Sequence, residues 1–394
     1  MNIFLYIFII TLWLSSIDSI DSISCLDEEG NPIDSWTSIK AYNSDKYYTF
    51  NEEMATWELS KFTVSQTVDG CIMQTMNQLY GENSIFSQPY PVMAGIYNDE
   101  PTTGQSVSSS YAHAKGILVS SEKNGGFWLL HSMPNWPNTI GNTTPGVFPS
   151  LTYAQSLICI SLDSHNSNQV AGNLMIDHPF IYSSVNSQEL SSVMPLMSDW
   201  LNNVKSSSTS NVSMFESSNG KKFNQFAKSG SWGKDLWDDL VAPHYEAEMN
   251  VETWRNGEGG RMSSICGQNG SKSNEEYSVY EVASIAMPDG ISWSGTEDHS
   301  KWGATLSTSS SLVSCVGDIN RMCSQESRGG GAICSDNLNL WEAFNSIIKS
   351  QESCYQYNPC YPYQTSTQCY WCPTNSPSVS PQESIKFNKL INFN

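Results

Sequence analysis

A pattern that occurs twice constrains the fold of this chain more than any other feature. His113 and Lys115 stand two positions apart, and His299 and Lys301 repeat that spacing later in the chain. A strand-like run and a loop precede each His-x-Lys unit, and a strand-turn-strand segment follows it. The repeat predicts a divergent internal duplication, with two halves of similar architecture.

The flanking runs define the expected secondary structure of each half. Strands are predicted at residues 91–99, 115–121, 127–132, 281–288 and, more loosely, across 302–320. The turn EKNGG at 122–126 closes the first hairpin, which ends near His131, and the second hairpin ends at Asn320. Apolar residues at helical spacing predict helices at 187–204, 233–245 and 338–350. We therefore expect an α+β fold, with mixed α/β halves.

The residue types in the two units suit phosphate chemistry. In a strand, residues two positions apart point to one face, so the histidine and lysine of a unit can meet one anion. Lysine offers positive charge to phosphate oxygens, and histidine can act as a nucleophile or a proton donor. Two units together could divide a slow phosphodiester hydrolysis into two displacements through a phosphohistidine, without a metal or other cofactor.

Structural roles remain as alternatives for single positions. A lone His-x-Lys carries little information, and the argument rests on finding two in matched surroundings. His131 could be a core histidine, Asn320 a turn residue and Asp298 a turn cap. Cys369 and Cys372 form the one C-x-x-C pair, and without a second pair at similar spacing a zinc site is a weak hypothesis.

The N-terminal segment and the cysteines indicate the secretory route. MNIFLYIFIITLWLSS is an apolar run followed by small and polar residues, which predicts a signal peptide over 1–24, with an uncleaved anchor as the alternative. The 11 cysteines fit an oxidising compartment, and their odd number leaves at least one free or intermolecular. Three sequons begin at Asn142, Asn211 and Asn269. We expect a soluble glycoprotein that is lysosomal or secreted.

The formal net charge of −20 at pH 7 bears on possible partners. Such a chain repels nucleic acids and anionic membranes at neutral pH. Near pH 5 the histidines gain charge and carboxylates begin to be neutralised, so a protein of this charge that acts on a polyanion suits an acidic compartment. The other explanation is that acidity keeps a secreted protein soluble, and charge alone leaves both open.

Several strings resemble a known family. They are YNDEP (97–101), HAKG (113–116), GGFWLLHSMPNWP (125–137), FAKSGSWGKDLW (226–237), TEDHSKW (296–302), CVGDINR (315–321) and RGGGAIC (328–334). Together they are similar to the acid deoxyribonuclease II family over about residues 25–354. Many relatives carry a hydroxyl residue where this chain has Ala114, but that position should point away from the site, so we expect activity to survive.

The resemblance implies a fold and an activity. The fold would be similar to that of phospholipase D enzymes, a pseudo-dimer in which two halves, about 25–170 and 171–354, close on one active site. The activity would be metal-independent endonucleolytic hydrolysis of DNA that leaves 3′-phosphate ends. DNA would be the substrate, no cofactor would be required, and a monomer with internal pseudo-symmetry is expected, although a dimer stays open.

The resemblance also implies residue roles. His113 would be the nucleophile and Lys115 its phosphate-binding partner, while His299 would be the general acid and Lys301 the second phosphate contact. His131 and Asn320 would orient phosphate or the catalytic histidines, with Asp298 in a supporting place. We expect a DNA groove whose lysines are joined by Arg321.

The family's cysteine pattern implies three disulfides. They are Cys25–Cys159, Cys266–Cys354 and Cys315–Cys334, and the cysteines left without an assigned partner are Cys71, Cys323, Cys360, Cys369 and Cys372. Residues 355–394 form a Cys/Pro/Ser-rich tail outside the family pattern. Two other functions stay open: a phospholipase D-like phosphodiesterase acting on lipid, and an inactive secreted DNA-binding protein.

Overall fold

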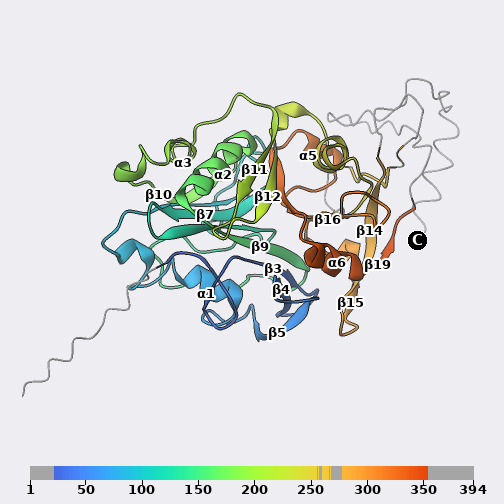
Figure 1. Ribbon diagram of the computed structural model, residues 1–394, viewed down its shortest axis with the longest axis horizontal. Helices are drawn as coiled ribbons and strands as arrows, with labels where there is room; N and C mark the ends of the chain where they lie inside the picture. Colours follow the sequence, from blue (N-terminus) through green and yellow to red (C-terminus); the bar gives the residue numbers. More distant parts are fainter. Residues whose placement is uncertain (1–21, 255, 257–259, 266, 268–276, 354–394) are drawn as a thin grey trace, which may run out of the picture.

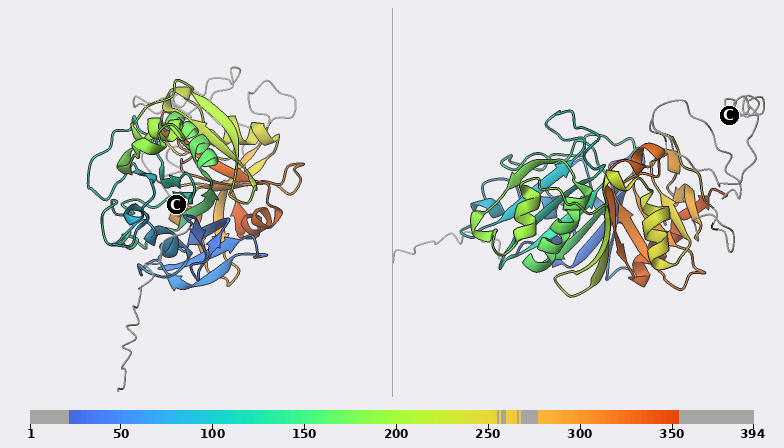
Figure 2. Two further views of the ribbon diagram at one scale, coloured as in Figure 1. Left: turned by 60° about the vertical axis from the view of Figure 1, so that its left-hand side comes forward. Right: turned by 90° about the horizontal axis from the view of Figure 1, so that it is seen from above.

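Two large β-sheets form the body of the protein (Figure 1). The computed structural model describes residues 22–254, 256, 260–265, 267 and 277–353, and every structural statement below concerns these residues. Seen from above, the strands of the first sheet, blue to green, lie beside the yellow-to-red strands of the second (Figure 2). The predicted mixed α+β fold is confirmed at this level.

The first sheet has eight strands in the order β10-β6-β7-β8-β9-β3-β4-β5, and all neighbours are antiparallel. The strands are β3 (Ser35–Lys40), β4 (Lys46–Asn51), β5 (Glu58–Thr63), β6 (Met93–Asn98), β7 (Lys115–Ser121), β8 (Gly125–His131), β9 (Gln155–Leu162) and β10 (Ile181–Val185). The small pair β1 (Cys25–Leu26) and β2 (Pro32–Ile33) precedes it. The central strands β6 to β9 are buried almost throughout, as their continuous apolar runs require.

The second sheet has nine strands, in the order β11-β12-β18-β17-β16-β13-β14-β15 with β19 paired to β14. They are β11 (Ser210–Glu216), β12 (Lys222–Lys228), β13 (Met249–Glu252), β14 (Val279–Ala286), β15 (Ser292–Ser294), β16 (Trp302–Thr305), β17 (Ser314–Gly317), β18 (Gly330–Ser335) and β19 (Ile348–Gln351). The pair β13 and β14 is parallel, and the other neighbours are antiparallel.

The helices are short and few. They are α1 (Cys71–Asn77), α2 (Ser164–Asp177), α3 (Pro195–Leu201), α4 (Ala242–Tyr245), α5 (Cys323–Glu326) and α6 (Leu338–Ser346), with a π-helical turn at Trp237–Val241 and 3-10 turns at Ile85–Ser87, Gln188–Leu190, Gly230–Trp232 and Gly295–Glu297. The longest, α2, contacts β7 and β8 of the first sheet and β11 and β12 of the second. It therefore packs across the junction between the sheets.

Both predicted hairpins form, as β7 with β8 and as β16 with β17, and strands cover the predicted runs before them. The two halves differ in which strand lies beside the hairpin. In the first sheet, β6 pairs directly with β7. In the second sheet, however, β13 lies between β14 and β16, so β13 is the strand that occupies the place of β6. Its four residues are too short a run for periodicity to reveal.

The predicted helices are present only in part. The stretch 187–204 yields a 3-10 turn and then α3, which begins at Pro195 because proline fits the first turn of a helix better than its interior. The stretch 338–350 begins helical as α6 but passes into β19 at Ile348. Helix α2 was not predicted, because its many polar residues obscure the apolar periodicity of its buried face. Asp163 caps its N-terminus by accepting a hydrogen bond from the Asn166 backbone N–H.

A shared core joins the two sheets. One buried apolar cluster contains Trp128 and Ile158 of the first sheet together with Trp302 and Val316 of the second. Polar contacts cross the same boundary: the Tyr48 hydroxyl donates to the Asp289 carboxylate at 2.8 Å, and the Ser217 hydroxyl donates to Asp34 at 2.7 Å. The sheets are thus parts of one packed body.

Two of the implied disulfides are present. Cys25–Cys159 links β1 to β9, and Cys315–Cys334 links β17 to β18. Cys71 is a buried free thiol, and Cys323 is disulfide-bonded. The implied Cys266–Cys354 pair and the tail at 355–394 lie outside the described residues.

The chain joins the folded body just before Cys25. Ile23 is buried and donates its backbone N–H to the Asn124 carbonyl at 2.6 Å. The Gln78 amide donates to the Ser24 carbonyl at 2.7 Å. Most of the predicted signal peptide precedes the described residues. In the part of the chain that the structure describes, no helix is both long and apolar enough to cross a membrane. The sequon residues Asn142 and Asn211 are exposed, and Asn269 lies outside the described residues.

Trp57 offers a test of whether the two sheets stabilise one another. Its side chain is 2% exposed, its indole N–H donates to the Ala343 carbonyl of α6 at 2.9 Å, and its ring packs edge-on against Phe344. Replacing Trp57 by Ala should lower the free energy of unfolding by about 3–5 kcal/mol, because a large buried ring is removed from the junction. Denaturant titration measures this loss.

The control for that experiment is Val68→Ala, at a position 62% exposed, which should change stability by less than about 0.5 kcal/mol. Two separate unfolding transitions in the wild type, or a Trp57→Ala effect as small as that of the control, would contradict a common core.

Candidate active site

The first His-x-Lys unit lies at the start of β7, beside the carboxylate of Asp99. Lys115 is buried, and its ammonium donates to Asp99 Oδ1. His113 Nε2 lies 3.9 Å from Asp99 Oδ2. Burial acts to raise the pKa of Asp99, but its interactions with Lys115, His113 and Arg328, in that order, hold that pKa far below its ordinary value. Asp99 therefore stays ionised and fixes the ammonium of Lys115.

A segment from the second sheet's half of the chain braces this unit. Arg328 donates through Nη2 to Asp99 Oδ2 and to the Ala112 carbonyl, both at 3.0 Å. The next residue, Gly329, accepts the His113 backbone N–H on its carbonyl oxygen at 2.9 Å. His113 is thus held in place by residues more than two hundred positions away in the sequence.

The glycines after Arg328 let this segment approach so closely. A Cβ atom on Gly329 would lie 2.0 Å from the Asp177 carbonyl oxygen, and one on Gly331 would lie 2.2 Å from the Phe226 carbonyl oxygen. Both obstacles are backbone atoms that cannot move aside. The buried Lys228 ammonium fixes the turn by donating to three carbonyl oxygens, including that of Arg328 at 2.7 Å.

The second His-x-Lys unit is held in turn by hydrogen bonds to the first half of the chain. His299 donates its backbone N–H to the Ala154 carbonyl at 2.9 Å, and Lys301 donates its backbone N–H to Ser156 Oγ at 3.1 Å. Ala154 in turn donates to the Glu297 carbonyl at 3.1 Å. This segment at the start of β9 belongs to the first sheet, so each unit is held by the other half of the chain.

Two aromatic rings hold the imidazole of His299. The Tyr153 ring stacks on it at 4.2 Å between centroids, with only 7° between the planes. The Trp254 ring lies 3.9 Å away at 59°. Within the described residues, His299 Nε2 is buried and has no hydrogen-bond partner. That nitrogen is the polar atom of the unit left open for a ligand.

The charges of the two units act on one another. Burial and, in decreasing order, the charges of Lys301, Lys115 and Lys40 together lower the pKa of His299 to about 2. Burial, with the charge of Lys115, lowers the pKa of Lys301 to about 7. Burial likewise lowers the pKa of His113, with Lys115 and Lys301 acting in the same direction. These mutual effects require the two units to lie close together.

The predicted supporting residues occupy different places. His131 is fully buried; its Nδ1 accepts the Met133 backbone N–H at 3.1 Å, and its Nε2 has no partner in the described part of the chain. Burial and the charge of Lys115 lower the pKa of His131. Asn320 is also buried, and the described residues give its Oδ1 no partner.

Asp298 has a structural environment. It is fully buried and accepts the Trp293 indole N–H and the Ser300 backbone N–H, each at 2.7 Å. The Ser300 hydroxyl donates to it as well. Its oxygens therefore shape the turn that enters the second unit, in agreement with the turn-cap alternative.

Arg321 does not line a groove, and that expectation is wrong. Its side chain is fully buried and forms ion pairs with Asp238, at 2.7 Å, and with Glu281. Its backbone N–H donates to Thr253 Oγ1 at 3.1 Å. The guanidinium is thus neutralised inside the second half and is not available to a phosphate.

Four residues at the site were not predicted from the sequence as site residues. Asp99, Arg328, Tyr153 and Trp254 contact the two units. Asp99 and Arg328 stand inside the strings YNDEP and RGGGAIC, which could have drawn attention to them. Tyr153 and Trp254 are isolated aromatics in loops and carry no signal of their own.

The carboxylates near His113 could in principle suit a metal. Asp99, Glu100 and His113 offer ligand atoms within 4.8 Å of one another. However, Lys115 and Arg328 already take both oxygens of Asp99. Two cations on the central carboxylate would compete with a metal ion, so the donor set fits an ion-pair network better than a metal site.

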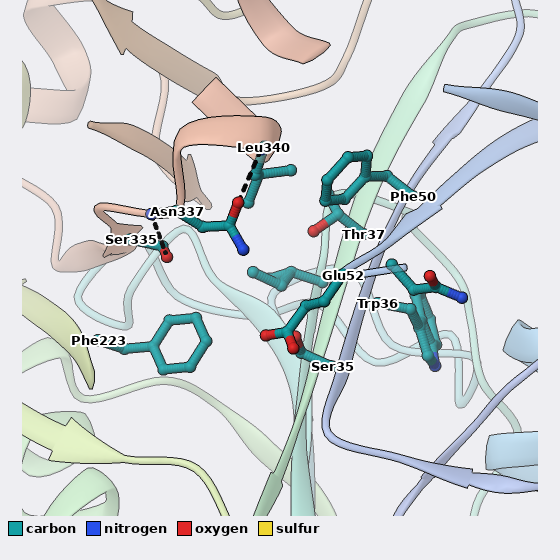
Figure 3. A pocket seen from close by; sticks show the side chains of 11 residues that line it. Ser35, Trp36, Thr37, Phe50, Glu52, Phe223, Ser335, Asn337 and Leu340 are labelled. Carbon is teal, nitrogen blue, oxygen red and sulfur yellow. Dashed lines mark hydrogen bonds between the residues drawn. The ribbon is translucent and has the colours of Figure 1, made fainter. Parts of the chain in front are cut away.

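A small pocket lies between the sheets, apart from the two His-x-Lys units. Figure 3 shows this small pocket, which Glu52 and Trp36 of the first sheet line together with Phe223 and Asn337 of the second half. Glu52 forms an ion pair with Lys221 beside it. The pocket contains none of the predicted site residues, and its position does not change the assignment of the site.

A buried carboxylic acid under the glycine segment links stability to pH. Asp318 Oδ1 accepts the Gly331 backbone N–H at 2.7 Å. Burial raises the pKa of Asp318 to about 7, and that of the neighbouring Asp177 is raised too. Because the folded pKa lies above the unfolded value near 4, the protonated acid favours folding at low pH. This contribution is lost progressively as the pH rises from about 4 to about 7.

Asp318→Asn should remove that pH dependence. Between pH 4 and 7 the wild type should lose up to about 1.4 kcal/mol of unfolding free energy per pH unit from this group, and the variant should lose less. Urea titrations at three pH values measure the slope. The exposed Asp336→Asn is the matched control and should keep the wild-type slope. Equal slopes for Asp318→Asn and the wild type would contradict the assignment.

Comparisons with known proteins identify the family of the chain. The family model of deoxyribonuclease II matches residues 24–354. Plancitoxin-1 of Acanthaster planci is 28% identical over 352 residues, covering 85% of this chain and 93% of that protein. Deoxyribonuclease-2-alpha of Bos taurus is 28% identical, with 85% and 91% covered. Cell death-related nuclease 6 of Caenorhabditis elegans is 31% identical, with 79% and 81% covered.

The family match spans the whole of both sheets and includes both His-x-Lys units and the segment that begins at Arg328. The chain therefore belongs to the deoxyribonuclease II family and is an endonuclease of that type, a hydrolase of phosphodiester bonds.

Proposed function

We propose that the protein is a metal-independent acid endodeoxyribonuclease that cleaves DNA to leave 3′-phosphate ends. The observation that carries this proposal is the reciprocal bracing of the two units: the His113 backbone N–H donates to Gly329, and the His299 backbone N–H donates to Ala154, so each unit is held by the other half of the chain. The charges of the lysines act across the units in the same sense, since Lys115 lowers the pKa of His299 and Lys301 lowers that of His113. Two lysines and two histidines gathered in this way can bind one phosphate and supply both a nucleophile and an acid.

In the first step, the imidazole of His113 attacks the phosphorus while Lys115 and Lys301 neutralise the phosphate oxygens. The bond between phosphorus and O5′ breaks, and its electron pair goes to O5′. Protonated His299 gives its proton to that oxygen, so one strand leaves with a 5′-hydroxyl. The other strand stays attached to His113 through its 3′-phosphate, as a phosphohistidine.

In the second step, water attacks the phosphorus of the phosphohistidine. His299, now neutral, accepts a proton from the water, and the bond between phosphorus and the His113 nitrogen breaks. The products are a free 3′-phosphate and the original enzyme. The residues proposed to support these steps are His131, Asn320 and Asp298, the last by shaping the turn at His299.

The acid requirement follows from the charges at the site. In the unliganded protein, burial and the nearby lysines hold the pKa of His299 at about 2, so its ring is neutral at pH 5. A bound phosphate diester adds negative charge and raises that pKa. The protonated fraction of His299 in the complex then grows as the pH falls, and the rate of the first step grows with it.

The proposal includes the two-half architecture of the phospholipase D type, with one active site per monomer. The reciprocal bracing of the two units supports it. The strand pairing favours a boundary after Val185, because β10 completes the first sheet. DNA would lie over Lys115 and Lys301 without Arg321. The two disulfides support an oxidising route, and we propose a lysosomal or secreted location.

Nicking of supercoiled plasmid at pH 5 and pH 7.5, in EDTA, tests the proposal. The wild type should nick at pH 5 and far less at pH 7.5, and His113→Ala should lose activity by at least about 10³-fold. The matched control is His165→Ala, an exposed histidine on α2, which should keep wild-type activity.

Loss of nicking in EDTA with recovery on adding a divalent cation would overturn the metal-independent mechanism. If DNA is bound but never cut at either pH, the protein is a DNA-binding member that has lost its activity. Cleavage of phosphatidylcholine vesicles in place of plasmid would instead favour the lipid phosphodiesterase.

A further inference from the structure

We propose that Tyr153 and Trp254 form an aromatic clamp that positions His299 for proton transfer to the leaving oxygen. The inference deepens the proposed function and rests on its assignment of His299 as the general acid. Neither ring is a catalytic residue in this account, since each would act through the imidazole that it contacts.

The clamp encloses the imidazole on two sides. Tyr153 covers one face of the imidazole in a nearly parallel stack, and Trp254 approaches it at an angle. The centroids of the Tyr153 and Trp254 rings lie 4.7 Å apart. Aromatic contacts of this kind contribute about 0.5–1.5 kcal/mol each beyond burial. The three rings therefore form one packed cluster.

Hydrogen bonds do not fix the orientation of this imidazole within the described part of the chain. Within these residues, the hydrogen bonds of His299 involve its backbone: the N–H donates to Ala154, and the carbonyl accepts from Lys301. Ring nitrogen Nε2 is buried without a partner. Catalytic histidines are commonly oriented through their second nitrogen. Here the packing of two rings takes over that task.

The clamp is assembled from both halves of the chain. Tyr153 directly precedes the β9 region that braces the second unit, and Trp254 follows β13. A buried cation holds Tyr153 in place: the fully buried Lys40 donates to the Tyr153 carbonyl at 2.8 Å and also to the Leu151 carbonyl. A buried lysine is costly unless it has such partners. The buried ammonium of Lys40 thus stabilises the backbone segment that carries Tyr153.

The clamp would have two consequences for the reaction. It would hold Nε2 in line with the departing O5′, which matters because proton transfer needs hydrogen-bond distance and direction. It would also limit the access of water to the ring, which keeps the imidazole neutral until a phosphate arrives. Both effects concern the proton transfers at His299 and not the attack by His113.

Two substrates that differ in their leaving group separate proton transfer by His299 from attack by His113. DNA loses an alkoxide that needs a proton, whereas thymidine 3′-(4-nitrophenyl phosphate) loses nitrophenolate, which departs without one. Tyr153→Leu and Trp254→Leu should each lower kcat on DNA by about 10-fold or more, with KM within about twofold. On the nitrophenyl ester the rate of nitrophenolate release in the first turnover, which precedes the hydrolysis step that also uses His299, should stay within about threefold of wild type. Tyr153→Phe should keep wild-type activity on both.

Controls address folding and position. Tyr245→Leu removes a tyrosine that packs against a histidine, His244, away from the site, and it should leave both activities unchanged. Thermal unfolding of each variant shows whether it folds. A loss that is equal on both substrates in Tyr153→Leu and Trp254→Leu, or no loss on DNA, would overturn the clamp.

His299→Ala distinguishes failure of the clamp from failure of the proposed function. If His299 is the general acid, this variant should lose much more of its first-turnover rate of cleavage on DNA than of its first-turnover release of nitrophenolate from the ester. In that background, adding Tyr153→Leu should have no further effect on DNA. Equal losses of His299→Ala on both substrates would remove the general-acid assignment, and the clamp proposal would fall with it.

Discussion

The structure depends above all on the reciprocal bracing of its two His-x-Lys units. His113 donates its backbone N–H to Gly329, and His299 donates its backbone N–H to Ala154. Each bond joins a reactive unit to the opposite half of the chain. A shift of one half against the other would therefore disturb both histidines at once. The glycine segment after Arg328 makes one of these contacts sterically possible, since a Cβ on Gly329 would meet the Asp177 backbone.

The bracing gathers positive charge inside a strongly acidic protein. The chain carries a net charge of −20, yet Lys115, Lys301 and Lys40 are buried near one another at the site. Their proximity is unfavourable in the unliganded protein, as the lowered pKa of Lys301 indicates. Asp99 offsets part of the repulsion next to His113. The remaining positive potential is available to a phosphate diester, which could enter where the rest of the surface would repel it.

How much of this could be read from the sequence depends on the range of each interaction. The hairpin at β7 and β8 was predictable, because its apolar runs and turn residues are local signals. The two histidines and two lysines were found through their repeated spacing. Arg321 was misplaced, because an arginine next to a site motif looks the same whether it faces solvent or a buried Asp238. Burial is a property of the fold, and residue type does not reveal it.

Other features could not be predicted from local sequence patterns, because they depend on contacts between distant parts of the chain. The short β13 became recognisable only through its pairing with β16, and α2 is too polar to show a helical period. The rings of Tyr153 and Trp254 meet His299 from separate parts of the chain. Such contacts could be inferred from sequence only if the register of both sheets were already known.

The most direct test of the two-unit site is to trap its covalent intermediate. His299→Ala, mixed with thymidine 3′-(4-nitrophenyl phosphate) at pH 5 in EDTA, should release nitrophenolate but hydrolyse the adduct slowly. Mass spectrometry of the digested protein should then find a thymidine 3′-phosphoryl group on His113, and His113→Ala should show none. An adduct on another residue, or turnover without any adduct, would contradict the account.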